Sequence, residues 1–224
     1  MSLLQDNRHP LWDLPTRFFH WAIVCLLPLS WLTAETDNYE WHSWIGYSVL
    51  VLVAFRICWG FIGSRHSRFS DFLVGPARVL AYVRGKGAAS VGHNPLGGWS
   101  VVVLLLLLAL QGVSGLFNSE DIIFEGPLYY AASSELRDTM GNVHEITFNV
   151  LLGFIALHIG AVFYHQLRLK EKLLQAMLRG RAVGREGKAS PAPLWLALLL
   201  LALLAGLLWW GLSLAPQPDP GRWG

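Results

Sequence analysis

Residues 143–158, VHEITFNVLLGFIALH, form a mainly apolar stretch that carries a histidine near each end, His144 and His158. On an α-helix, residues with this spacing are displaced by about 21 Å along the axis and rotated by only about 40° from each other. An unpartnered imidazole in lipid is costly, so a histidine in a membrane span usually faces a bundle interior, a cavity or a cofactor. The stretch therefore predicts a membrane helix with two polar sites at two depths on one face.

The whole chain has the composition of a membrane protein. Of its 224 residues, 54% are hydrophobic and 14% are charged, a balance that a soluble domain of this length would not keep in solution. Apolar runs long enough to cross a hydrocarbon core of about 30 Å occur at residues 17–34, 42–63, 99–117, 142–165 and 193–215. We expect an all-α integral membrane protein: a four-helix transmembrane bundle with a fifth C-terminal transmembrane helix.

The distribution of charge predicts the orientation of these helices. The connection at 64–98 holds five Lys or Arg residues and that at 166–192 holds seven, whereas the loops at 35–41 and 118–141 together hold eight carboxylates. Positive loops remain in the cytoplasm. We therefore expect a multi-pass membrane protein with a cytoplasmic N-terminus and its C-terminus on the outer face; the family resemblance described below implies that this membrane is the bacterial inner (cytoplasmic) membrane and the outer face is periplasmic.

This topology pairs four histidines by depth. His20 opens the first apolar run at the cytoplasmic side and shares the inner level with His158, while His42 opens the second run at the outer side and shares the outer level with His144. Two imidazole pairs across a helix bundle suit two six-coordinate b-type haems, with the four histidines as axial ligands of iron. The chain contains no C-x-x-C-H sequence, which excludes covalent c-type haem attachment.

Two assignments at the inner level stay open on these grounds. His165 lies seven residues beyond His158, about 10 Å further inward on nearly the same face, so depth alone leaves both as the ligand opposite His20. Arg56 is the charged residue lying well inside an apolar run. It is either a counter-ion for haem propionates, together with Arg17, or a side chain that snorkels to the inner boundary.

Several short sequences, in this order and spacing, resemble the bacterial cytochrome b561 superfamily, and most closely its branch containing the b-type cytochrome subunits of membrane-bound nickel-iron hydrogenases. They are PTRFFHW at 15–21, HSWIG at 42–46, Arg56, WGFIGSRHSRF at 59–69, GHNP at 92–95 and the histidine-bounded stretch that ends at His158. The resemblance covers about residues 10 to 175. It implies a haem-binding four-helix cytochrome b in which His20, His42, His144 and His158 are the ligands, and so favours His158 over His165.

The resemblance and the charge pattern together predict a division of the chain into three segments. We expect a four-helix cytochrome b domain at 1–168, a basic cytoplasmic linker at 169–192, and the fifth transmembrane helix with a periplasmic tail at 193–224. The GHNP sequence is interpreted as a turn and the start of a helix, with no ligand. The fifth helix is absent from the usual four-helix core of the family.

The predicted function is electron transfer between the membrane quinone pool and a periplasmic redox partner. Side chains at the inner level predict a quinone site, namely those of Arg17, His20, Arg56 and His165. The acidic outer loops predict a partner with a basic patch, either a c-type cytochrome or the electron-transfer subunit of a periplasmic oxidoreductase. No feature indicates binding of nucleic acid.

Two other functions remain open. A superoxide oxidase would pass electrons from superoxide to quinone, but acidic outer loops would not attract that anion. A transporter or proton channel would use the same histidines as relays without haem. An electron-transfer subunit of a respiratory oxidoreductase is favoured over a stand-alone enzyme.

Overall fold

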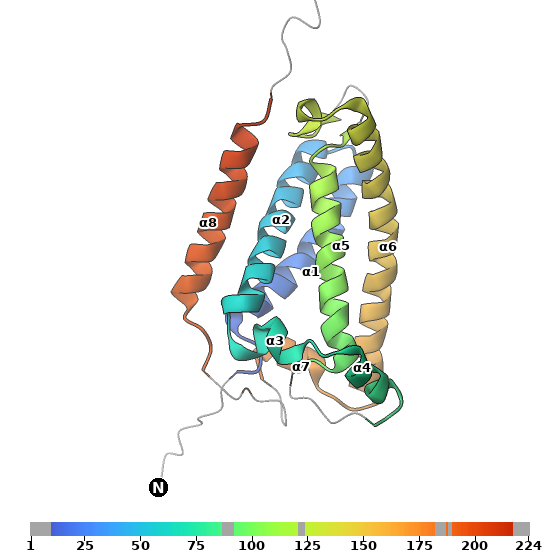
Figure 1. The fold of residues 1–224 in the computed structure, drawn as a ribbon, viewed down its shortest axis with the longest axis vertical. Helices are drawn as coiled ribbons and strands as arrows, with labels where there is room; N and C mark the ends of the chain where they lie inside the picture. Colours follow the sequence, from blue (N-terminus) through green and yellow to red (C-terminus); the bar gives the residue numbers. More distant parts are fainter. Residues whose placement is uncertain (1–9, 87–91, 121–123, 182–186, 188–189, 217–224) are drawn as a thin grey trace, which may run out of the picture. The chain divides into compact units, whose positions relative to one another are not determined.

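The computed structural model describes residues 10–86, 92–120, 124–181, 187 and 190–216. Five of its helices are long and apolar enough to cross a membrane. They are α1 (Leu14–Glu35), α2 (Tyr39–Ile62), α5 (Pro95–Gly115), α6 (Ser134–Leu167) and α8 (Leu194–Ser213) (Figure 1). These helices confirm the all-α membrane fold and the five spans predicted from the apolar runs.

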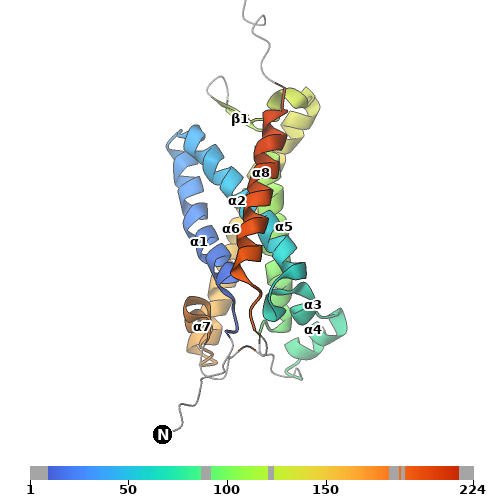
Figure 2. The same ribbon diagram turned by 90° about the vertical axis from the view of Figure 1, so that its left-hand side faces the viewer.

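Short elements connect the long helices. They are η1 (Arg65–Ser67), α3 (Phe69–Phe72), α4 (Pro76–Val83), η2 (Tyr129–Ala131), α7 (Leu173–Arg179) and a hairpin of β1 (Ser119–Glu120) and β2 (Phe124–Glu125) (Figure 2). The two strands are antiparallel, with Ser119 opposite Glu125. The hydrophobic pattern did not predict these elements because each is too short to show a period.

Polar caps set where the long helices begin. The Asp13 carboxylate accepts a hydrogen bond of 2.9 Å from the backbone N–H of Thr16 and so caps α1. The Asn94 side chain accepts one of 2.7 Å from Gly97 N–H at the start of α5, where Pro95 is the first helical residue. Both arrangements satisfy helix donors that lack an intrahelical acceptor. The second confirms that the GHNP sequence is a turn followed by a helix start.

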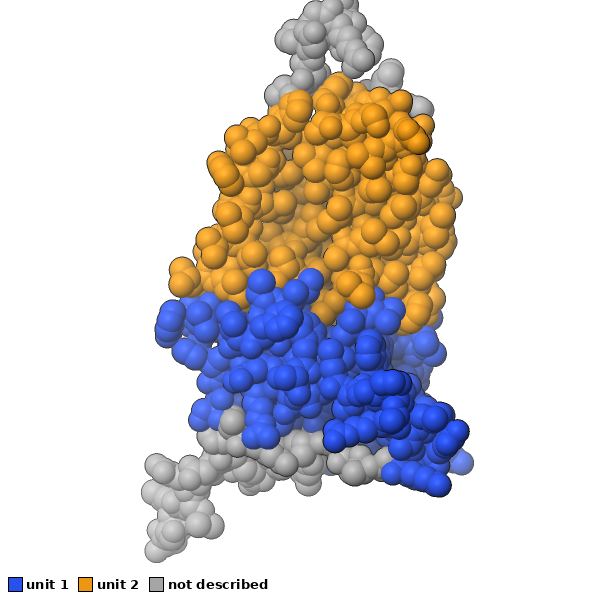
Figure 3. Space-filling view, in the orientation of Figure 1, with its two compact units in different colours: residues 1–21, 56–103, 155–198 blue, residues 22–55, 104–154, 199–224 orange. Residues whose placement is uncertain are grey.

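The contacts within the chain divide it into two compact units (Figure 3). Unit 1 comprises Met1–Trp21, Arg56–Val103 and Ile155–Leu198, and unit 2 comprises Ala22–Phe55, Leu104–Phe154 and Leu199–Gly224. Each of the five long helices contributes a segment to both units. Each predicted histidine pair falls within a single unit.

In unit 1, the segment before α1 packs on α7. Leu11, Trp12 and Ala176 form a buried cluster with Met177 beside it. The backbone N–H groups of Leu11 and Trp12 both donate to the carbonyl of Gly180, at 2.7 and 3.2 Å. Gly180 ends α7 with a φ of 80°, a left-handed conformation that glycine adopts without strain. These contacts fix the position of the first turn of α1.

In unit 2, α5 packs closely on α2. A Cβ added to Gly112 would lie 2.6 Å from Cδ2 of Leu50, so a larger residue would require the Leu50 side chain to move. The apolar core around it comes from both helices and includes Val49, Leu52, Val53, Phe55, Leu105 and Leu108. The α8 segment of this unit contacts α2 through Trp209, whose ring is stacked on that of Trp44 with centroids 6.3 Å apart.

Candidate functional site

In unit 2, the structure brings the rings of His42 and His144 together in an edge-to-face arrangement. Their ring centroids lie 6.3 Å apart and their planes are inclined by 76°. Two imidazoles that bind one metal ion from opposite sides place their centroids about 6 Å apart, because each metal–nitrogen bond is about 2 Å long. The spacing of this pair therefore fits a single metal ion held between the two rings.

Backbone carbonyls orient both rings. Nδ1 of His42 donates to the carbonyl of Ser30 at 2.8 Å, and Nδ1 of His144 donates to the carbonyl of Gln111 at 2.9 Å. A carbonyl only accepts, so the proton of each neutral ring lies on Nδ1 and the lone pair lies on Nε2. Histidines that bind metals show this same arrangement, in which the second nitrogen donates to a protein acceptor.

Helix α5 contributes three residues to the His144 ring, and none of them was predicted. Ser114, which is fully buried, places its hydroxyl 3.2 Å from Nδ1, and the Gln111 side-chain amide lies 3.0 Å from Nε2. A Cβ added to Gly115 would lie 2.9 Å from Cε1 of the ring. The one sequence signal was the pair Gln111 and Ser114, which interrupts a leucine-rich run with two polar residues on one helix face.

In unit 1, the structure brings His20 and His158 close enough to interact electrostatically. Nδ1 of His20 is buried and has no hydrogen-bond partner among the described residues. A buried polar atom without a partner is costly, so this ring fits a site that is completed by a ligand. Within the described ranges, Nδ1 of His20 thus differs from Nδ1 of His42 and of His144, which donate to backbone carbonyls.

His165, the rival of His158, has protein partners at both nitrogens. Its Nδ1 lies 3.3 Å from Oε2 of Glu171, and its Nε2 lies 3.5 Å from the side-chain nitrogen of Asn94. Both nitrogens of His144 have protein partners as well, so these contacts do not distinguish His165 from His158. The choice of His158 as the second ligand in unit 1 stays a prediction.

Arg56 lies in the interior of unit 1. Its side chain is only 2% exposed, so it does not snorkel to a boundary. The guanidinium interacts electrostatically with Asp13 and lies 5.5 Å from the centroid of the Phe69 ring. Its Nη1 has no hydrogen-bond partner in the described part of the chain. A buried cation with an unused donor fits an anionic group such as a propionate.

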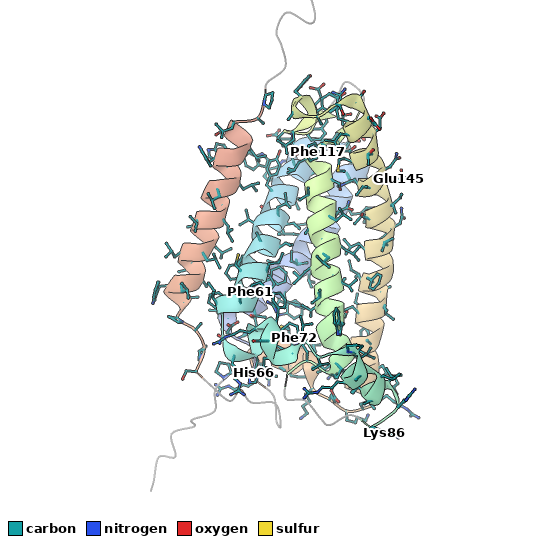
Figure 4. All side chains as sticks on the ribbon, viewed as in Figure 1. Phe61, His66, Phe72, Lys86, Phe117 and Glu145 are labelled. Carbon is teal, nitrogen blue, oxygen red and sulfur yellow. The ribbon has the colours of Figure 1, made fainter. Side chains whose placement is uncertain are left out.

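Asp13 and its neighbours form a buried polar network around Arg56. The Asp13 carboxylate accepts hydrogen bonds from Nε1 of Trp59 at 2.9 Å and from the Thr16 backbone. The Thr16 hydroxyl lies 2.7 Å from that of Ser67, next to the buried His66 on η1 (Figure 4). The sequence did not predict this network, because its members come from α1, α2 and η1.

Arg17 contacts the end of α7. Its side chain donates to the carbonyls of Met177, at 3.2 Å, and of Leu178. These carbonyls belong to the last turn of α7, where cationic side chains are favourable. Arg17 therefore has a structural task in addition to the predicted role as a counter-ion.

Each site offers the donor set of a haem-binding protein. Among the described residues, no group of three or more His, Cys, Asp or Glu side chains is placed to hold a metal ion. Two imidazoles fit an iron whose remaining ligands come from a porphyrin, as in b-type cytochromes. The residues present therefore fit haem at both pairs.

Comparison with known proteins gives one match. Residues 11–180 match the sequence model of the family described as prokaryotic cytochrome b561. The matched region contains all seven predicted site residues and excludes α8. Neither the curated proteins nor the solved structures include a match to this chain.

Proposed function

Because the chain belongs to the prokaryotic cytochrome b561 family, we propose that it is a diheme cytochrome b that transfers electrons between the quinone pool and a periplasmic redox partner. The family consists of membrane electron-transfer proteins that bind haem b. The observation that carries the proposal is the pair of His42 and His144. Their ring centroids lie 6.3 Å apart, a distance that fits two imidazoles bound to one metal ion. Haem, when bound, supplies one-electron redox chemistry that no side chain of this chain provides.

We assign His42 and His144 as the ligands in unit 2, and His20 and His158 as the ligands in unit 1. In unit 2, the carbonyls of Ser30 and Gln111 accept from Nδ1 of the two rings and leave the lone pair on Nε2, which in His144 accepts from the Gln111 side-chain amide at 3.0 Å. In unit 1, the buried cation of Arg56 offers its free Nη1 to an anionic propionate. The orientation that these ligands need is thus built largely from backbone carbonyls and one buried charge.

The quinone site belongs in unit 1, around Arg17, His20, Arg56 and His165. Conversion of one quinone into a quinol takes two electrons and two protons, so the site needs groups that exchange protons with water. His165 lies beside Glu171, whose side chain is 35% exposed. This pair can deliver protons from the aqueous side to a quinone held near Arg56.

A pocket of about 430 Å³ in unit 2 supports docking of a basic partner. It lies at the turn between α1 and α2, and its lining residues include Asp37, Tyr39, Glu40, Trp44, Tyr47 and Phe124. Carboxylates beside aromatic rings suit a lysine or arginine side chain. His42 follows Glu40 by two residues, so a partner docked here would lie close to the unit 2 site. Asp121, also counted in the predicted acidic face, lies outside the described residues.

The orientation and the division of the chain remain part of this proposal. We place the protein in the bacterial inner membrane with its N-terminus in the cytoplasm, since the basic residues concentrate in the segments 64–98 and 166–192. Residues 1–168 then form the cytochrome b domain, 169–192 the basic linker and 193–224 the fifth helix with its periplasmic tail.

The first test is a reduced-minus-oxidised spectrum of the detergent-purified protein with its haem-to-protein ratio. We expect about two b haems per chain, about one after His144→Ala or His20→Ala, and still two after His165→Gln. Loss of a haem in His165→Gln, with both retained in His158→Ala, would transfer the ligand role to His165. Protein without haem would overturn the proposal and favour a histidine relay.

A second assay distinguishes electron transfer from a protein partner from superoxide oxidation. Carboxylates at the pocket repel an anion such as superoxide, so we expect slow haem reduction by superoxide and fast reduction by a basic cytochrome c. Faster haem reduction by superoxide than by the basic cytochrome c would instead support the superoxide oxidase function.

A further inference from the structure

We propose that α4 and the first turns of α5, both in unit 1, form a binding site for an anionic phospholipid. The site combines an apolar groove, which takes an acyl chain, with cationic side chains that bind the negatively charged headgroup. The proposed electron transfer makes no use of this part of the chain, so the two proposals stand or fall separately.

Helix α4 is amphipathic and contributes no buried residue to a core. Pro76, Val79, Leu80 and Val83 follow one another at helical spacing and therefore share one face. Leu80 is 48% exposed and Val83 is 62% exposed. The helix has eight residues, far fewer than the roughly 20 that cross a bilayer. Its apolar face therefore suits a helix that lies in the membrane interface.

This apolar face forms one wall of a groove, and α5 supplies the other. The groove has a volume of about 420 Å³ and is lined by the four apolar residues of α4 together with Trp99. Figure 1 shows α4 beside the foot of α5. Nε1 of Trp99 donates to the carbonyl of Val74 at 3.0 Å, so the indole has its polar atom satisfied and its ring against the groove. A groove with only apolar lining residues suits an acyl chain.

Three cationic side chains accompany the groove. Arg78 lies within α4, Arg84 is the C-cap of the helix, and Lys86 follows two residues later, as Figure 4 shows. The backbone N–H of Lys86 donates to the carbonyl of Ala81, which holds this residue against the end of the helix. All three side chains are exposed, and none of them forms an ion pair with another residue that the structure describes.

No carboxylate close in sequence neutralises these cations. The chain contains no Asp or Glu between residues 72 and 119. Asp71, the nearest one in sequence, is already paired with Arg65 at 3.4 Å and with His66 at 2.8 Å. The surface of α4 therefore keeps its positive charge for a negatively charged ligand.

Charge distinguishes an anionic phospholipid from other apolar ligands of the groove. Each Lys or Arg near an anionic lipid surface raises affinity roughly fivefold. A quinone also has an apolar tail, but its neutral headgroup would leave the three cations unused. A zwitterionic phospholipid carries a phosphate together with a cation of its own, so it gains less from the same side chains.

Native mass spectrometry of the full-length protein in detergent tests the headgroup preference. At low salt, we expect phosphatidylglycerol to bind roughly a hundredfold more tightly than phosphatidylcholine with the same acyl chains. Arg78→Gln with Arg84→Gln should reduce this preference to roughly fivefold, whereas Arg78→Lys with Arg84→Lys should retain it. These changes lie on a helix without buried residues, and thermal unfolding checks that each variant folds.

The matched control for charge is Arg168→Gln with Arg179→Gln, which removes two exposed arginines from another segment of unit 1. It should retain the full preference for phosphatidylglycerol. An equal loss in this control would show that net charge, and not the surface of α4, attracts the lipid, and would overturn the proposal. Equal binding of the two lipids by the wild type would overturn it as well.

A second pair of substitutions tests the groove. Leu80→Asn with Val83→Asn should weaken the binding of both phospholipids and keep the preference between their headgroups. Glycerol 3-phosphate has the charge but no acyl chain, so it should not compete with phosphatidylglycerol. Competition by this ester would assign the site to a free phosphate, competition by a decyl quinone would assign the groove to quinone, and a dimer that binds neither lipid would assign it to a second copy of the chain. Each of these three results would overturn the proposal.

Discussion

The side-chain amide of Gln111 donates a hydrogen bond of 3.0 Å to Nε2 of His144. That nitrogen is the one that the ring orientation leaves for iron, since Nδ1 donates to the Gln111 backbone carbonyl. One residue of α5 therefore holds both nitrogens of the ring, one through its backbone and the other through its side chain. For His144 to serve as the proposed ligand through Nε2, the Gln111 side chain would have to turn away, whereas the backbone contact at Nδ1 could stay.

Removal of the Gln111 amide should strengthen haem binding in unit 2. A hydrogen bond of this kind contributes about 1 kcal/mol, so Gln111→Leu should raise the affinity about fivefold. The same change removes the buried Oε1, which has no partner among the described residues. Haem titration of the apoprotein measures the effect.

A side chain at position 115 should cause loss of the unit 2 haem. In Gly115→Ala, the new Cβ would lie 2.9 Å from Cε1 of His144 and force the ring out of its position. The haem-to-protein ratio should fall from about two towards one. Gly153→Ala on α6 is the matched control, since a Cβ there meets nothing within 4 Å, and it should keep both haems.

Loss of the Arg56 charge should destabilise the protein strongly. In Arg56→Met, the buried Asp13 carboxylate keeps its donors Trp59 and Thr16 but loses its cation. A buried carboxylate that loses a nearby cation is less well compensated for its burial, at a cost of about 1 to 3 kcal/mol. Thermal unfolding in detergent should show this loss, and Asp13→Asn in the same chain should recover part of it. Additive effects of the two changes would mean that the two residues are not coupled.

Neutralising the pocket carboxylates should slow electron uptake from a basic cytochrome c. For Asp37→Asn with Glu40→Gln, we expect the bimolecular rate of haem reduction at low salt to fall by roughly tenfold, with a weaker dependence on ionic strength. Stopped-flow absorbance measures both quantities. Glu171→Gln, which removes one carboxylate in unit 1, should leave the rate unchanged; an equal loss there would show that net charge, and not the pocket, governs the encounter.

The long helices could be predicted because a long apolar run is compatible with few structures besides a membrane-spanning helix. The limits of the helices were harder to predict, since caps and polar turns decide them. Helix α6 begins at Ser134, eight residues before the apolar run that predicted it, because its first turns are polar. Hydropathy measures the part of a helix in lipid and does not detect a helical extension into water.

The sequence predicted that His42 and His144 lie together but not which residues orient their rings. His42 and His144 were paired correctly in space because topology alone brings their helix ends together. The roles of the Ser30 and Gln111 carbonyls could not be predicted. Every residue has a carbonyl, and only the fold shows which ones accept a hydrogen bond from a histidine ring. Burial of Arg56 was likewise invisible, because its exposure depends on Phe69 and Asp13 from other segments.

The contacts between the first residues and α7 have a consequence for biosynthesis. Leu11 and Trp12 donate to the carbonyl of Gly180, and Arg17 donates to that of Met177, 160 residues later in the chain. A ribosome makes these acceptors only after α1, α2, α5 and α6 have been synthesised. The start of α1, with His20 one turn beyond Arg17, can therefore make these contacts only after Met177 and Gly180 have been synthesised. Acquisition of haem at His20 and His158 should accordingly be a late, post-translational event.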